Sequence, residues 1–414
     1  MPRVADRSVL LIGTLDTKGE EYSFARTRFA NAGIATILID AGVFPPVALN
    51  PDVTNEVVAR AGGSSLQALR ESNDRGQAVS IMSLGALSIV EEFYAAGAID
   101  GIFAFGGSSG STIASLSMRA LPIGVPKVLV STLAASNAAS FVGESDIAIF
   151  ASVVDIAGIN SISARIFSNA IDAMIGMLQS KPAVNVSDKK LIAASMFGVT
   201  TTCVTDARMR LEQHGYEVIT FHMTGSGGRS MEKLISQGLI HGVLDVTTTE
   251  LCDEIVGGTL SAGPDRLTAA VEKRIPQVIS LGALDMVNFG TRTSVPKKFD
   301  NRKLYSHNDN VTLMRTTADE CEKIAIDICS KLSRATSPVS LFIPLKGVSA
   351  IAVKDAPFYD PVADDALFST IRKNVPRQID LIELDNAIND PVFSAAMASK
   401  LITYVDQGWE NSNG

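Results

Sequence analysis

The chain has few of the residues that mark a disulfide scaffold or a metal site. Its 414 residues include only four cysteines, four histidines and one tryptophan. The cysteines, at positions 203, 252, 321 and 329, form no C-x-x-C pair and no Cys/His cluster with metal-ligand spacing. This pattern disfavours a disulfide framework and a dedicated metal centre. It predicts a reducing, cytoplasmic environment, with Cys321 and Cys329 as core thiols of one helix.

Long apolar runs and basic tracts are also missing. No uninterrupted stretch approaches the roughly 18 apolar residues of a membrane span, and the apolar segment at 9–13 is too short for a signal peptide. Acidic residues outnumber basic ones by 44 to 36, which gives a net charge of -8. Such a mild, dispersed negative charge disfavours a nucleic-acid-binding surface. We expect a globular protein that binds neither membrane nor nucleic acid.

What the chain does have is a regular alternation of apolar runs and amphipathic patterns. In the first half it predicts helices over 20–32, 80–96 and 111–120, and strands at 9–13, 35–42, 101–105 and 126–134. After a polar stretch at 179–188 the pattern restarts, with a closing helix over 390–407 and strands expected at 189–198, 216–223, 242–246, 277–285, 340–347 and 378–385. Apolar strands separated by helices are typical of a parallel sheet covered on both faces. We therefore predict an α/β fold of two Rossmann-like lobes, 1–183 and 184–414. Each is expected to be a mostly parallel sheet flanked by helices, with a cleft between the lobes.

The strongest functional signal is a glycine-rich loop between an expected strand and an expected helix. It consists of Gly106, Gly107, Ser108, Ser109, Gly110, Ser111 and Thr112. Glycines let an anion approach the backbone, and the start of a helix offers unpaired N–H groups at the positive end of its dipole. No acidic residue follows in the next turn to repel a phosphate. The loop predicts a phosphate site, with a purely structural turn as the alternative.

A second loop follows the first expected strand and contains Thr14, Asp16 and Lys18. Lys18 could reach a phosphate from the side, and Asp16 could hold a metal ion or a hydroxyl group. Thr17 and Glu20 have the spacing of a capping box, so helix initiation explains the motif equally well. Because strand ends meet at one edge of a doubly wound sheet, we expect this loop and Thr132 to lie near the first loop.

The second half carries another glycine-rich loop, with Thr224, Gly225, Gly227, Gly228 and Arg229 as candidate substrate-binding residues. Arg229 is suited to a carboxylate or a phosphate. Polar residues at expected strand ends are candidate acid–base groups: His222, Asp245, Glu250 and Asp285. A packed histidine and a capping box at Thr247 and Glu250 are the simpler explanations. These residues predict either a metabolic enzyme with a small acidic substrate in the cleft or a binding module without turnover.

The first loop also matches the G-x-S-x-G nucleophile elbow of serine hydrolases, with Ser108 as the nucleophile. Such an enzyme needs an acid and then a histidine downstream. Asp155 or Asp245 with His307 are candidates, but nothing in their surroundings distinguishes them. The hydrolase is the weakest of the alternatives.

Several sequence blocks follow one another in a characteristic order: GTLDTKGEE, FGGSSGST, TGSGGRSME, GVLDVTTTE, GALDMVNFG, KGVSA and FYDP. In these blocks the chain resembles the UPF0261 family of Tm-1-like proteins, from about residue 8 to about residue 407. The resemblance implies two α/β lobes, of which the N-terminal one binds ATP, and assembly as a homodimer. We therefore expect ATP, with Mg²⁺, to have its phosphates on the loop 106–112. The family's GGSGGT pattern falls on 106–111, so Ser109 stands in place of glycine and Ser111 in place of threonine. Ala387 stands where Tm-1-like sequences carry a histidine.

Overall fold

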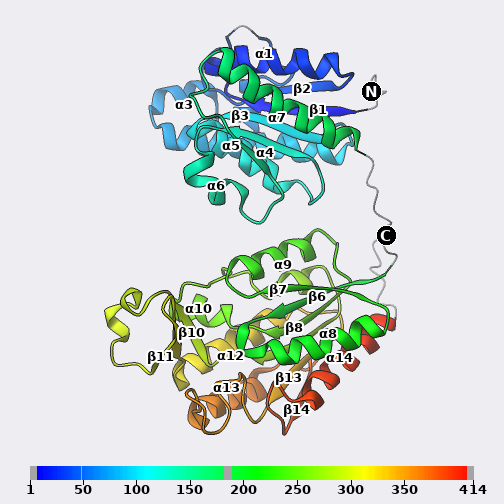
Figure 1. Cartoon of the computed structure of the whole chain (residues 1–414), viewed down its shortest axis with the longest axis vertical. Helices are drawn as coiled ribbons and strands as arrows, with labels where there is room; N and C mark the ends of the chain where they lie inside the picture. Colours follow the sequence, from blue (N-terminus) through cyan, green and yellow to red (C-terminus); the bar gives the residue numbers. More distant parts are fainter. Residues whose placement is uncertain (1–6, 48, 181–188, 408–414) are drawn as a thin grey trace. The chain divides into compact units, whose positions relative to one another are not determined.

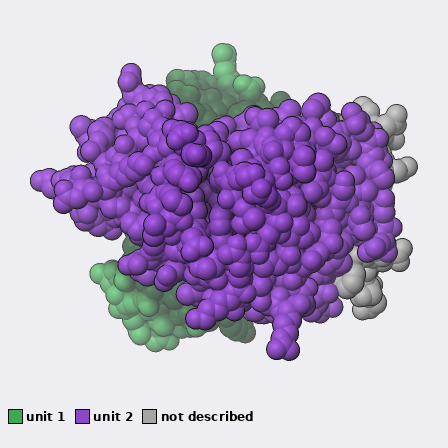
Figure 2. Space-filling view, turned by 90° about the horizontal axis from the view of Figure 1, so that it is seen from below, with its two compact units in different colours: residues 1–185 green, residues 186–414 purple. Residues whose placement is uncertain are grey.

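The computed structural model describes residues 7–47, 49–180 and 189–407. The chain divides into two compact units, residues 1–185 and residues 186–414 (Figures 1 and 2). Each unit is built on a parallel sheet with helices on both faces, which confirms the predicted α/β class and its two mostly parallel sheets.

Unit 1 contains a five-stranded parallel sheet in the order β2-β1-β3-β4-β5. Its strands are β1 (Ser8–Gly13), β2 (Ala35–Asp40), β3 (Gly101–Gly106), β4 (Lys127–Ser131) and β5 (Ala148–Ala151). Every residue of β1, β3 and β4 is buried, as their continuous apolar sequences require. From β1 the chain moves first to one side, to β2, and then to the other, to β3. This reversal makes the carboxyl ends of β1 and β3 the expected ligand-binding edge.

Alternate residues of these strands pack under different helices. Phe103 and Phe105 face α1 (Leu15–Asn31) and α7 (Ser161–Gln179), whereas Ile102 and Ala104 face the opposite layer. That layer contains α4 (Arg75–Ala95) and α5 (Ser108–Ala120), and the shorter helices of the unit are α2 (Asn55–Ala61), α3 (Leu66–Ser72) and α6 (Ala134–Val142). Helix α1 begins at Leu15, five residues before the predicted start, so the motif around Lys18 belongs to its first turns.

Helix α4 alone among the helices that the structure describes is long and apolar enough to cross a membrane. It carries seven buried residues and packs against α2 and α5. A core helix of an α/β unit passes the same test, so this is weak evidence for a membrane span.

Unit 2 repeats this strand order and extends it. Its six-stranded parallel sheet has the order β7-β6-β8-β9-β13-β14, in which the first five strands correspond in sequence to the order of unit 1. The strands are β6 (Leu191–Met196), β7 (Glu217–His222), β8 (Gly242–Thr247), β9 (Gln277–Gly282), β13 (Val339–Pro344) and β14 (Asp380–Leu384). The expected strands of the second half are therefore all present.

Two helix layers cover the sheet of unit 2. On one face lie α8 (Thr201–Gln213) and α14 (Pro391–Asp406). On the other lie α9 (Ser226–Ser236), α10 (Glu250–Val256), α11 (Ala269–Glu272), α12 (Ala318–Leu332) and α13 (Pro361–Asn374). Cys321 and Cys329 are buried in α12, as predicted.

A small antiparallel sheet, absent from the prediction, is inserted between β9 and α12. It has the order β10-β12-β11, with β10 (Met286–Phe289), β11 (Leu304–Asn308) and β12 (Val311–Arg315). The 3-10 turns of the unit are η1 (Gly198–Thr200), η2 (Arg292–Ser294) and η3 (Lys297–Phe299). Buried residues of the insertion, Met286 and Leu313, pack with Val199, which follows the end of β6.

Candidate functional site

The glycine-rich loop after β3 forms the start of α5, and its first amide groups are free. Gly107 is the N-cap residue and has no side chain to cap the helix. Within the described parts of the chain, no oxygen accepts a hydrogen bond from the N–H groups of Ser108, Ser109 or Gly110; the first bonded amide is that of Ser111, to Gly107 O at 2.9 Å. The first turn contains no acidic residue. Unpaired amides at the positive end of a helix dipole form a binding site for an anion.

Arg75, at the start of α4, lies beside these amides. Its Nε and Nη2 donate to Ser109 Oγ over 3.3 and 3.1 Å. Ser109 is in the helical first turn of α5 and is not one of the residues with positive φ. The serine at this position therefore causes no backbone strain, and its hydroxyl group accepts hydrogen bonds from the Arg75 guanidinium.

A pocket of about 460 Å³ adjoins this helix start at the carboxyl ends of β1 and β2. Its volume lies in the range of small-molecule sites. The polar part of the lining is Thr14, Asp16, Thr17, Arg70, Asn73, Asp74, Arg75 and Ser109, and the apolar part includes Val43, Phe44, Leu69, Val79, Met82 and Ile113. The Arg70 guanidinium lies over the Phe44 ring, 5.7 Å from its centroid. One pocket thus combines an apolar wall with two arginines and, through Ser109, adjoins the start of α5.

Two carboxylates lie near the carboxyl ends of β1 and β2. Asp16 lines the pocket, whereas Asp40 ends β2 in a fully buried position and is not among the lining residues. Asp40 Oδ1 accepts hydrogen bonds from the amides of Leu15 (3.1 Å) and Gly42 (2.8 Å), but Oδ2 has no donor. Burial raises the pKa of Asp40 to about 6, and the negative charge of Asp16 acts in the same direction. No group of three or more metal-ligating side chains occurs in the described residues. Asp16 could therefore hold Mg²⁺ only together with ligand oxygens, which is how Mg²⁺ is usually bound.

The structure does not bring all the predicted residues of unit 1 to the pocket. Lys18 donates from Nζ to Ile156 O (2.7 Å), beside α7, and does not line the pocket. Ser111 Oγ lies 2.8 Å from Ser131 Oγ, Thr112 Oγ1 donates to Ser108 O, and Thr132 donates its N–H to Gly106 O. These groups fix the loop instead of facing a ligand. The capping box at Thr17 and Glu20 is wrong, because α1 starts earlier and Thr14 is its N-cap.

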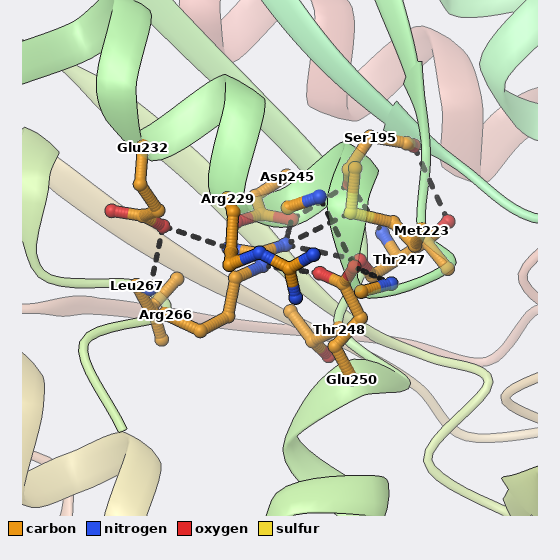
Figure 3. A network of polar contacts seen from close by, with 12 residues as sticks. Ser195, Met223, Arg229, Glu232, Asp245, Thr247, Thr248, Glu250, Arg266 and Leu267 are labelled. Carbon is orange, nitrogen blue, oxygen red and sulfur yellow. Dashed lines mark hydrogen bonds and ion pairs between the residues drawn. The ribbon is translucent and has the colours of Figure 1, made fainter. Parts of the chain in front are cut away.

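The second glycine-rich loop is occupied by a carboxylate of the chain itself (Figure 3). Glu250 Oε1 accepts from the amides of Gly225 (2.7 Å) and Gly228 (3.1 Å) at the start of α9. A Cβ atom on Gly228 would lie 2.0 Å from Glu250 Oε2, so glycine is needed for this close approach. The predicted capping box at Thr247 and Glu250 does not form, because the glutamate is turned into this loop. The loop binds an internal anion in place of a substrate.

The same glutamate belongs to a buried network centred on Arg266 (Figure 3). The Arg266 guanidinium, fully buried, binds Asp245 through Nη1 and Nη2 at 2.6 and 2.7 Å, and Glu250 through Nε at 2.8 Å. It also contacts Glu232 at 3.2 Å. Asp245 and Glu250 are sealed from solvent and held by Arg266, and burial raises the pKa of Glu250. The prediction that they act as acid–base groups on a substrate does not agree with this closed environment.

The remaining candidates of unit 2 lie elsewhere. Asp285 is fully buried, accepts from Ser349 Oγ (2.8 Å), and has a pKa raised to about 6 by burial. His222 is exposed at the end of β7 and packs against Phe197, with ring centroids 5.5 Å apart. Arg229 is exposed and donates from Nη1 to Ser261 O (3.2 Å). Thr224 donates from Oγ1 to His222 O. These residues form no common catalytic arrangement.

The hydrolase alternative finds no base within unit 1. All four histidines of the chain belong to unit 2, so no residue of unit 1 could serve as the histidine base for Ser108. His307 is exposed on β11.

Comparison with known protein families gives two adjacent matches. The models of the N-terminal and C-terminal domains of the Uncharacterised protein family UPF0261 match residues 7–183 and 189–405, respectively. A UPF0261 protein from Clostridium tetani is 49% identical over 403 residues, which is 97% of this chain and 100% of the relative. The ToMV susceptible protein tm-1(GCR26) from Solanum lycopersicum is 42% identical over 332 residues, which is 76% of this chain and 44% of the relative.

Solved structures give only distant similarity. A UDP-N-acetylglucosamine 2-epimerase from Rickettsia bellii matches 97% of each chain, with 9% identity and a TM-score of 0.23. So weak a likeness says nothing about function.

Proposed function

This chain belongs to the UPF0261 family, and from that premise we propose that its unit 1 binds a nucleotide, ATP with Mg²⁺, at the start of α5. One observation carries the proposal. The amides of Ser108, Ser109 and Gly110 have no acceptor in the described structure and adjoin a pocket of about 460 Å³. The comparable amides of α9 in unit 2 already bind Glu250. Of these two glycine-rich helix starts, the one in unit 1 is open to an external anion.

The lining of the pocket suits the two halves of a nucleotide. The phosphates would accept hydrogen bonds from the α5 amides and from Arg75, the arginine that already contacts Ser109. Asp16 would contribute a carboxylate to the Mg²⁺ ion that accompanies the phosphates. The base would pack against the apolar wall around Val43 and Leu69. Arg70 above Phe44 offers a flat surface at the same pocket for stacking.

The surroundings of unit 2 favour a binding role over the enzyme alternative. Asp245 and Glu250 are committed to Arg266, and His222 and Asp285 lie apart from them. We accordingly propose a nucleotide-binding protein and assign no catalytic residue.

Gly107 allows a sharp test, because it is the N-cap of α5 and its backbone is extended, with φ −78°. A Cβ atom there would meet only Thr132 Oγ1, at 3.9 Å. In Gly107→Asp the new carboxylate would accept hydrogen bonds from the free amides, as an N-cap aspartate does. In the matched control Gly107→Ala the amides would stay free. Isothermal titration with MgATP is expected to give binding to the native protein and to Gly107→Ala, and at least about tenfold weaker binding to Gly107→Asp.

The stability of the same variants completes the test. The free energy of unfolding of Gly107→Asp should exceed that of Gly107→Ala by about 1 kcal/mol, because the aspartate adds an N-cap to α5. Denaturant unfolding of both variants measures this difference. If Gly107→Asp is more stable than Gly107→Ala and yet does not bind ATP, misfolding cannot be the reason for the loss of binding. If the native protein gives no heat with millimolar MgATP, or if Gly107→Asp binds as the native protein does, the proposal is wrong.

A further inference from the structure

A second pocket lies in unit 2, away from Arg266 and its partners. It has a volume of about 630 Å³ and is formed by the segment after β13, one side of α13 from its first to its last turn, and the segment after β14. The polar lining is Lys346, Lys354, Asp364, Asp365 and Arg372, and the apolar lining includes Leu345, Val353, Tyr359, Phe368 and Ala387. The KGVSA and FYDP sequence blocks both contribute to it. Neither block has a role in the nucleotide proposal.

The pocket contains a buried hydrogen-bond acceptor that is held in place from behind. Asp364 is 8% exposed, and its Oδ1 accepts from Arg315 Nη2 at 2.5 Å. Arg315 is itself fixed, because its Nε donates to Phe358 O (2.9 Å) and its Nη1 to Thr316 Oγ1 (2.7 Å). Asp364 Oδ2 receives no hydrogen bond from the described residues and, unlike Asp285 Oδ1, is not sealed from solvent. This oxygen is therefore open to a donor in the pocket.

The pocket also contains a cation that forms no ion pair with a carboxylate in the described parts of the chain. Lys346 pairs with Asp385 (2.7 Å) and Arg372 with Glu383 (2.6 Å). Lys354 is exposed and has no ion pair or hydrogen bond among the residues that the structure describes. Apolar residues complete the lining of the pocket. They include the aromatic residues Phe368 and Tyr359.

We propose that this pocket binds a small carboxylic acid with a flat apolar body and a hydroxyl or ammonium group at its far end. The ligand's carboxylate pairs with Lys354, and its donor group bonds to Asp364 Oδ2. The body packs against Val353 and Phe368, and the short side chain of Ala387 leaves room for it. The site is independent of the nucleotide site, since all its residues belong to unit 2.

The test uses the full-length protein and a set of phenolic acids of increasing length: para-hydroxybenzoate, para-hydroxyphenylacetate and para-hydroxyphenylpropionate. We expect at least one to bind in ligand-observed NMR titrations at concentrations up to about 10 mM. The matching acid without the hydroxyl group and the matching phenol without the carboxylate should each bind at least about tenfold more weakly, since each loses a charge-assisted hydrogen bond.

Three variants locate the binding. Lys354→Ala removes the cation, and Ala387→Phe fills the pocket; each should weaken binding at least about tenfold. Lys373→Ala, which removes an exposed lysine of α13 outside the pocket, should bind as the native protein does. Binding by none of the acids, or binding that Lys354→Ala and Ala387→Phe leave unchanged, would overturn the proposal. Asp364→Asn is a supplementary variant only, because it also removes the partner of buried Arg315.

Discussion

Arg266 forms ion pairs with Asp245, Glu250 and Glu232 in unit 2, so a single buried guanidinium group faces three carboxyl groups. Asp245 and Glu250 were predictable as polar residues at strand ends, whereas Arg266 was not, because it lies in a segment without a strand, a helix or a glycine-rich motif. The sequence indicated a buried basic residue only indirectly. Acidic residues in continuous apolar strands need a buried positive charge nearby, but only the folded chain shows which basic residue supplies it.

Asp40 gives a residue-scale prediction about pH. Its pKa is raised to about 6 by burial, above its ordinary value of 3.8, so the native state holds this proton more tightly than the unfolded chain does. Stability should therefore fall as the pH rises from about 4 to about 6, with the full cost present above that range. Asp40→Asn keeps an acceptor for the amides of Leu15 and Gly42 and removes the titration.

Between about pH 5 and about pH 8 the native protein should lose about 1 kcal/mol of unfolding free energy relative to Asp40→Asn, because only the native protein must ionise the buried carboxyl group. Urea denaturation at the two pH values measures it. Asp172→Asn is the control, because Asp172 is exposed on α7 and pairs only with the surface residue Arg28. An equal pH response in both variants would show that burial of Asp40 is not the cause.

At the scale of elements, α5 and α9 both begin with amide groups that can bind an anion, but only α9 has a carboxylate of the chain bound there. Each begins at a glycine-rich segment with no acidic residue in its first turn. At α9 the missing anion is supplied by Glu250, which approaches from α10, whereas at α5 no carboxylate takes that place among the described residues. The two loops could not be distinguished by their sequences, because the deciding residue is 22 positions away from Gly228.

Removing the internal anion should therefore create a site. In Glu250→Ala the amides of Gly225 and Gly228 and the guanidinium of Arg266 lose a partner, so unit 2 should be destabilised by about 3 kcal/mol or more. Sulfate should bind in the vacated place and raise the melting temperature of this variant more than that of the native protein.

Thermal unfolding in sodium sulfate and in sodium chloride of equal ionic strength measures this effect and removes general salt contributions. Glu254→Ala is a matched control. Glu254 is an exposed residue of the same helix, and its carboxylate accepts a hydrogen bond from Ser261 and none from the glycine-rich loop among the described residues. If sulfate stabilises Glu250→Ala no more than it stabilises Glu254→Ala, the loop is not an anion site.

The elements themselves were predictable to different degrees. The strands of both main sheets except β5 were visible, because buried parallel strands are continuous apolar runs. Strand β5 was missed because it has only four residues and none of them is fully buried. The antiparallel sheet β10-β12-β11 was not, because its strands have five residues or fewer and β11 is largely exposed. The start of α1 was misplaced because its first turn, which contains Thr17 and Lys18, has a polar sequence and a kink at Lys18. Of the site in unit 1, the glycine loop and Asp16 were found, whereas Arg70 and Arg75 come from a region without a recognisable motif.

For the whole molecule, the two units use one strand order and place their pockets within single units. Every residue that lines the proposed nucleotide pocket lies before residue 185. We therefore expect a fragment of residues 1–183 to bind MgATP with an affinity within about threefold of that of the full chain. Isothermal titration of both proteins measures this. A folded fragment, judged by circular dichroism, that does not bind would show that the site needs unit 2.

The difference between the two glycine-rich loops has a further thermodynamic consequence. The anion bound to the loop of unit 2 is the side chain of Glu250, so the occupancy of that loop does not depend on the concentration of any free ligand. Under the nucleotide proposal, unit 1 would gain stability in proportion to the logarithm of the ligand concentration once that concentration exceeds the Kd, whereas the stability of unit 2 would not depend on it.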